Sequence, residues 1–88
     1  MSASEGVSVR RFYPTLGPPG TEVTLVGAGF SPVPGQNVVQ FAGIAALVYR
    51  ATATELIVEV PLNADTGFIT VHNGHGTAHS GSVFTVTR

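Results

Sequence analysis

The stretch P-T-L-G-P-P-G-T-E-V-T-L-V-G-A-G-F, residues 14–30, decides the fold that we expect for this chain. It opens with a corner of prolines and glycines, which favours a sharp turn because proline has no N–H and glycine tolerates positive φ. We expect positive φ at Gly20. The following residues alternate, with Val23 and Leu25 facing one side, which is typical of a half-buried strand. A second glycine pair ends that strand, and Phe30 offers an aromatic ring to the core.

The rest of the chain consists of short apolar runs separated by turn residues. Besides 21–26, these runs predict strands at residues 7–13, 38–41, 44–49, 55–60, 68–72 and 82–87. About seven short strands without helical periodicity predict an all-β, immunoglobulin-like β-sandwich. The clearest hairpin turn is Asn73-Gly74-His75-Gly76. Together with Val23, Leu25 and Phe30, the predicted core contains Val9, Phe12, Val39, Phe41, Ala46, Val48, Leu56, Val58, Val60, Ile69, Val71, Phe84 and Val86.

The run G-P-P-G-T-x-V-T-L-x-G-x-G-F over residues 17–30 resembles the signature of the IPT/TIG family of immunoglobulin-like domains. Residues 9–14, 58–61, 66–71 and 84–86 resemble further strands of that family. The segment N-V-V-Q-F-A-G resembles its V-x-F-G-G segment, with Ala42 in place of the first glycine. The resemblance covers residues 7–87. It implies a domain of the kind found in cell-surface receptors, in extracellular bacterial proteins beside polysaccharide-active enzymes, and in some transcription factors, where it assists dimerisation.

Length and composition limit the possible functions. A chain of 88 residues has room for one domain, and we expect a flexible N-terminus at residues 1–6 and a single domain at residues 7–88. The net charge of −1, with four arginines and no lysine, lacks the basic patch of a nucleic-acid surface. Without cysteine, the chain has no disulfide and no thiolate chemistry. Since no run reaches ~18 apolar residues, we expect no membrane insertion.

Three histidines are the strongest candidates for chemistry. His72, His75 and His79 form an H-x2-H-x3-H pattern that resembles a set of metal ligands. No Cys, Asp or Glu lies nearby in sequence to complete the shell, so a polar hairpin tip is the preferred interpretation and metal binding is the alternative. A Ser–His–Asp triad can be written around His79, but its spacing does not support one. We therefore predict no metal site, no cofactor and no enzymatic activity.

Outward apolar residues are the remaining candidates. The alternation sends Val26, Tyr49, Ile57 and Phe68 away from the core, and we predict them as a possible interface with a protein partner or a second copy. Val38 also points outward. Charged residues make up only 10% of the chain, so its surface has little charge to keep partners away.

These observations predict a non-catalytic protein-interaction or spacer module of a bacterial cell-surface or secreted protein. The alternative is a carbohydrate-binding accessory domain attached to a polysaccharide-active enzyme. Tyr13, Tyr49 and Phe68 are the candidate aromatic residues for a sugar platform. Three aromatic residues on one face favour a sugar, and a flat aliphatic patch favours a protein partner. We expect an extracellular or cell-surface location as part of a larger protein, or a cytoplasmic one if the chain is complete.

Overall fold

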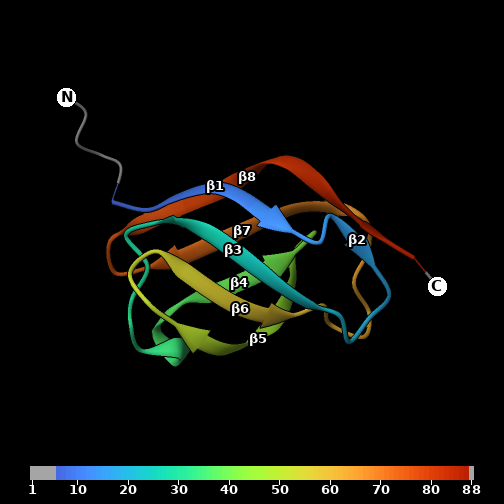
Figure 1. Ribbon diagram of the computed structural model, residues 1–88, viewed down its shortest axis with the longest axis horizontal. Coiled ribbons are helices and arrows are strands. Elements are labelled where there is room, and N and C mark those ends of the chain that lie inside the picture. The colour runs from blue at the N-terminus through green and yellow to red at the C-terminus, as the bar shows by residue number, and fades with distance from the viewer. Residues whose placement is uncertain (1–5, 88) are drawn as a thin grey trace.

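Eight β-strands and one 3₁₀ turn form the structure, a computed structural model that describes residues 6–87 (Figure 1). The strands are β1 (Ser8–Tyr13), β2 (Leu16–Gly17), β3 (Glu22–Ala28), β4 (Val38–Phe41), β5 (Ile44–Ala51), β6 (Glu55–Glu59), β7 (Gly67–Asn73) and β8 (Gly76–Val86). The 3₁₀ turn, η1, spans Pro34–Gln36. The predicted all-β, immunoglobulin-like sandwich is confirmed. Within residues 6–87, no helix is long and apolar enough to cross a membrane.

The strands lie in two layers that are connected through β5 (Figure 1). Neighbouring strands follow the order β1-β3-β6-β5-β4-β7-β8-β2, and β2 pairs with β8 in parallel while the other pairs are antiparallel. The strand β5 pairs with β4 through residues 44–46 and with β6 through residues 47–51. The chain therefore passes from one layer to the other within β5. We call the layers the β1–β3–β6 sheet and the β4–β7–β8 sheet.

The inner faces of both sheets supply one hydrophobic core, and Phe84 of β8 lies at its centre. Its ring centroid is 5.3 Å from that of Phe41 on the same sheet and 6.3 Å from that of Phe12 on the opposite sheet. Such edge-on and tilted aromatic pairs are favourable beyond the burial of their area. The buried core contains Val7, Phe12, Val23, Leu25, Phe30, Val39, Phe41, Leu56, Val58, Val60, Ala64, Ile69, Val71 and Phe84.

Most of the predicted core is confirmed, with two kinds of difference. Val9, Ala46, Val48 and Val86 pack against the core but are only partly buried, because they lie on β1, β5 and β8 at the margins of the layers. Val7 and Ala64 are buried although the alternation did not select them; Val7 directly precedes β1, and Ala64 lies in the loop between β6 and β7.

The corner between β1 and β3 has the predicted backbone geometry. Gly20 has a φ of +93°, and its N–H donates to the carbonyl oxygen of Val60 at 2.9 Å. At the far end of β3, a Cβ on Gly29 would lie 1.6 Å from the carbonyl oxygen of Gly6, so the chain entering β1 requires glycine there. The flexible N-terminus predicted for residues 1–6 otherwise lies outside the described residues.

The β7–β8 hairpin is longer than predicted. Its turn falls at Asn73–Gly76 as expected, but β8 begins at Gly76 rather than at residue 82. Thr77, Ala78 and His79 pair with β7 directly after the turn. Between the pairs Thr70–His79 and Phe68–Val83 the register shifts, and the extra residues of this bulge are the serine- and glycine-rich middle of β8. The alternation is interrupted at this bulge, which is why the sequence pattern began the strand too late.

The β4–β5 turn explains the departure from the family pattern at Ala42. Phe41 pairs with Ile44, which leaves a two-residue loop of Ala42 and Gly43. Both have positive φ, +52° and +88°, as in a type I′ turn. Alanine therefore occupies a backbone conformation that favours glycine.

Candidate interaction surfaces

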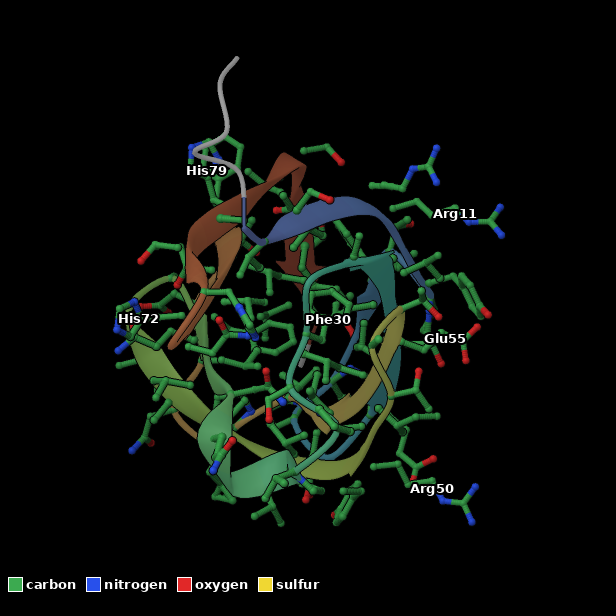
Figure 2. All side chains as sticks on the ribbon, turned by 90° about the vertical axis from the view of Figure 1, so that its left-hand side faces the viewer. Arg11, Phe30, Arg50, Glu55, His72 and His79 are labelled. Carbon is green, nitrogen blue, oxygen red and sulfur yellow. The ribbon has the colours of Figure 1, made fainter. Side chains whose placement is uncertain are left out.

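The outer face of the β1–β3–β6 sheet carries most of the charge. Between residues 6 and 87 there are seven Arg, Asp and Glu residues, and five of them lie here: Arg11, Glu22, Arg50, Glu55 and Glu59. Figure 2 shows Arg11, Glu55 and Arg50 on one side of the sandwich, with His72 and His79 on the other. We call this surface the charged face.

The charged face has an acidic end. Glu22 of β3 lies directly opposite Glu59 of β6, and like charges in such a cross-strand pair destabilise a sheet. The Tyr49 hydroxyl donates a hydrogen bond to Glu59 Oε1. This hydrogen bond, with desolvation and the nearby charges of Glu59 and Glu22, raises the pKa of Tyr49 above its usual value of 10.0. Tyr49 therefore stays protonated and relieves part of the repulsion by donating to one carboxylate.

Three of the four predicted interface residues lie on the charged face. Ile57 is outward, between Thr24 of β3 and Arg50 of β5, and both it and Val26 are half-buried among their neighbours. Tyr49 is 45% exposed. Phe68 lies on β7, in the other sheet, so the four residues do not form one patch.

The outer face of the β4–β7–β8 sheet is different, because none of its three strands contains Arg, Lys, Asp or Glu. Phe68 lies opposite Val83, Thr70 opposite His79, and His72 opposite both Val38 and Thr77. The exposed fractions are 50% for Phe68, 46% for Val38 and 41% for Val83. We call this surface, formed by Val38, Gln40, Phe68, Thr70, His72, Thr77, His79 and Val83, the uncharged face.

The structure does not bring the three histidines together as a group of metal ligands. No group of three His, Cys, Asp or Glu side chains that could hold a metal ion occurs in the described part of the chain. His72 Nδ1 lies 2.6 Å from Thr77 Oγ1, and the ring of His79 lies 6.2 Å from that of Phe68. His75 lies in the exposed turn. Two of the histidines, His72 and His79, are thus part of the uncharged face.

Ser80, the residue after His79, has its hydroxyl group engaged by the backbone. Ser80 is buried, and its Oγ accepts a hydrogen bond from the Ile69 N–H at 3.0 Å and donates to the Ser82 carbonyl oxygen at 2.7 Å. Its hydroxyl therefore completes the backbone hydrogen bonding of the bulge in β8.

The aromatic residues predicted for a sugar platform do not share a face. Tyr13 is outward on β1, since it pairs with Thr24 of β3, and Tyr49 lies on β5 at the opposite margin of the charged face. Phe68 lies on the uncharged face. The arrangement does not meet the condition that favoured carbohydrate binding.

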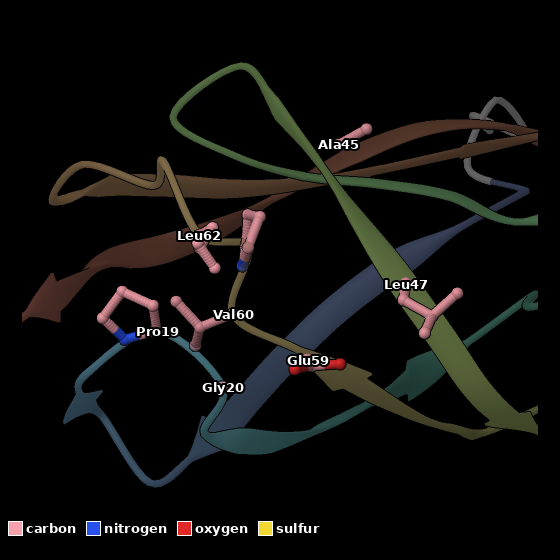
Figure 3. Close-up of a pocket in the computed structure, with 8 residues that line it drawn as sticks. Pro19, Gly20, Ala45, Leu47, Glu59, Val60 and Leu62 are labelled. Atoms are coloured by element: carbon pink, nitrogen blue, oxygen red, sulfur yellow. The ribbon is translucent and has the colours of Figure 1, made fainter.

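A shallow hollow of about 290 Å³ lies where the two faces meet, beside β5 (Figure 3). Its apolar lining includes Pro19, Leu47 and Leu62, and Glu59 is its one acidic side chain. Leu47 is 59% and Leu62 75% exposed. Sequence reasoning did not select either leucine. The run I-A-A-L of β5 could have given a signal, because its Leu47 must face outward when Ala46 and Val48 face inward.

Comparisons with known proteins place the chain in a family. A family model described as the IPT/TIG domain matches residues 8–86. No curated protein sequence matches the chain. Among solved structures, an auxiliary nutrient binding protein from Bacteroides thetaiotaomicron is 23% identical with a TM-score of 0.87, and the match covers 92% of this chain and 21% of that one.

Two other solved structures contain the same fold in different proteins. A γ-CGTase from alkalophilic Bacillus clarkii is 26% identical with a TM-score of 0.75, covering 98% of this chain and 13% of that one. The extracellular region of plexin A4 is 18% identical with a TM-score of 0.76, covering 98% and 11%. The chain thus spans about a fifth or less of the length of these three structures. From the family match over residues 8–86 and from the fold, the chain belongs to the IPT/TIG domain family.

Proposed function

We propose that this chain is a non-catalytic module that acts by protein contact, within a secreted or cell-surface protein, and that it self-associates through its uncharged face. The observation that carries this proposal is the segregation of charge between the two sheet faces. The recurrence of the fold as a small part of proteins with different printed names supports the role of a module. An extracellular region is among the proteins so named.

The partner that the uncharged face suits best is a second copy of itself. When two such faces pack about a two-fold axis, the same set of uncharged side chains lies on both sides of the contact. No like charges are therefore brought together. Phe68, Val38 and Val83 supply apolar area, which gains roughly 25 cal/mol per Å² when water is removed. The charged face is less suitable, because its acidic pair of Glu22 and Glu59 is already repulsive within one chain.

The size of the face limits the strength of this contact. The seven residues of β7 span about 24 Å, and three strands spaced ~4.8 Å apart give a width of roughly 14 Å. A flat area on the order of 340 Å² per copy is below the ~800 Å² of a stable standard interface. We therefore expect weak self-association, which a neighbouring module in the same protein could strengthen by raising the effective concentration.

A matched pair of variants tests the proposal. Phe68→Lys places a charge on the uncharged face, and Tyr49→Lys places the same charge on the charged face, at a side chain of similar exposure (50% and 45%). In sedimentation equilibrium from about 10 μM to 1 mM, we expect the wild type and Tyr49→Lys to associate and Phe68→Lys to remain monomeric. A monomeric wild type at the highest concentration, or loss of association only in Tyr49→Lys, contradicts the proposal.

Salt concentration separates this mechanism from association between charges. Screening weakens contacts between exposed charges, whereas the burial of apolar side chains depends little on it. We expect the association constant to change by less than about twofold between 50 and 500 mM NaCl. The carbohydrate alternative has its own readout, since binding of a soluble glycan to monomeric protein would favour it.

A further inference from the structure

A buried polar cluster ties the turn of the β7–β8 hairpin to the loop between β3 and β4. Asn73 and Asn37 are only 6% and 4% exposed. Asn73 Nδ2 donates to Asn37 Oδ1 at 3.0 Å and to the Gly29 carbonyl oxygen at 3.1 Å. Asn73 Oδ1 accepts from the His75 N–H at 2.7 Å. Both polar atoms of the Asn73 carboxamide are thus engaged by residues of two separate segments.

The sequence at this point is Asn73-Gly74, the pair that is chemically most open to attack by the backbone on the side chain. Glycine has no Cβ to hinder its own nitrogen, so the Gly74 nitrogen can approach the Asn73 carboxamide carbon when the chain is free. We propose that Asn73 is a deamidation site and that the folded state protects it from this reaction. The modification is spontaneous and needs only water as a co-reactant.

The reaction has two steps. The Gly74 backbone nitrogen loses its proton and bonds to Cγ of Asn73, the bond from Cγ to Nδ2 breaks, and ammonia leaves with the proton. Water then adds to either carbonyl carbon of the resulting five-membered imide and opens it. The products are aspartate and isoaspartate at position 73, and no electrons are transferred.

The cluster opposes the first step. Closing the imide ring expels Nδ2, so the hydrogen bonds that Nδ2 donates to Asn37 and Gly29 are broken. Buried polar groups that lose their partners are costly, so the reaction requires local opening of the hairpin end. The rate of modification therefore reports how often this end of the sandwich opens.

The product cannot restore the contact. An aspartate oxygen in the place of Nδ2 would face Asn37 Oδ1 and the Gly29 carbonyl oxygen, which are both acceptors in the present geometry. Isoaspartate also adds a backbone atom to a turn in which Asn73 pairs with Gly76. Modification therefore detaches the hairpin end from the β3–β4 loop, and hydrolysis of the imide does not regenerate asparagine because ammonia has left.

Peptide mapping by mass spectrometry tests the proposal. The purified chain is incubated at mildly alkaline pH, with and without unfolding concentrations of urea, and the peptide containing Asn73 is followed for the mass gain of an amide-to-acid exchange. We expect modification in urea and a rate on the order of 10³-fold lower in the folded chain, if opening resembles global unfolding. Equal rates in both conditions would overturn the proposed protection.

Gly74→Ala is the matched control for the chemistry. A Cβ at Gly74 has nothing within 4 Å and Gly74 is not among the positive-φ residues, so the variant should fold. We expect its Asn73 to be much more slowly modified in urea, whereas an unchanged rate would contradict attack by the Gly74 nitrogen. Asn73→Asp tests the consequence, with an expected fall in Tm of at least about 5 °C. An unchanged Tm would contradict the detachment.

Discussion

The two outer faces of this sandwich are built from similar strands but differ in charge. The charged face gathers Arg11, Glu22, Arg50, Glu55 and Glu59, while the strands of the uncharged face contain no Arg, Lys, Asp or Glu. Charge on one face favours a solvated surface, and its absence on the other leaves Phe68 and its neighbours open to contact. In this domain the few charged residues are not spread evenly over the surface, because they lie on strands that pair with one another in a single sheet.

The largest expected effect comes from removing a core side chain that contacts both sheets. Phe84→Ala deletes the ring that contacts Phe41 in one sheet and Phe12 in the other, so it should destabilise both layers together. We expect a loss of about 3–5 kcal/mol in the free energy of unfolding, measured by urea denaturation. A loss below about 1 kcal/mol would show that the two sheets do not depend on one core.

A smaller loss is expected at the corner below the charged face. Gly20→Val places a β-branched residue at a φ of +93°, although its Cβ would meet only Glu59 Oε2 at 3.9 Å. The cost is therefore that of the backbone, about 1–3 kcal/mol. Gly81→Val on β8 is the control, because Gly81 lacks positive φ and has open space around its Cβ position, and it should change stability by less than about 0.5 kcal/mol. Equal losses in thermal melts of the two variants would disprove a backbone effect.

A substitution in the β4–β5 turn, at the end of the β4–β7–β8 sheet, should increase stability rather than reduce it. Ala42 has a φ of +52° in the β4–β5 turn, where alanine is strained and glycine is not. Ala42→Gly should therefore raise the free energy of unfolding by up to about 1 kcal/mol. A clear loss of stability in urea denaturation would refute strain at this turn.

The smallest expected effect concerns pH at the acidic end of the charged face. The hydrogen bond to Glu59 raises the pKa of Tyr49 above 10.0, so the folded chain keeps a proton that the unfolded chain releases. Stability from this group is present below pH 10.0 and falls as the pH rises through the folded-state pKa. Glu59→Gln should bring the Tyr49 pKa down towards 10.0, which tyrosinate absorbance across an alkaline titration can follow. A titration of Tyr49 that is the same in both proteins would contradict this assignment.

Alternation along the chain predicted which side chains are buried, because each strand has one face in the core. The clearest case is β6, in which Leu56 and Val58 are buried while Ile57 lies outward. It could not predict β2, because two residues between prolines carry no periodic signal, and they pair in parallel with the distant β8. It also failed at the bulge in β8, where a register shift ends the alternation.

The candidate surfaces were less accessible to sequence reasoning than the core. Whether Phe68 shares a face with Ile57 depends on which sheet each strand joins, and the chain order alone does not give that pairing. The contact between Asn37 and Asn73 spans 36 residues, and neither side chain has a local pattern that indicates burial. Leu62 lies in a loop, so no alternation applied to it.

The central claim is that contact occurs through the uncharged face, and amide chemical shifts during dilution test it most directly. A series of NMR spectra from about 1 mM to 20 μM should move the amide signals of β4, β7 and β8, with Thr70, His79 and Val83 among the largest changes. The signals of Thr24 and Ile57 on the charged face should stay in place. Shifts centred on β3 and β6, or no shift at any position, would contradict the account.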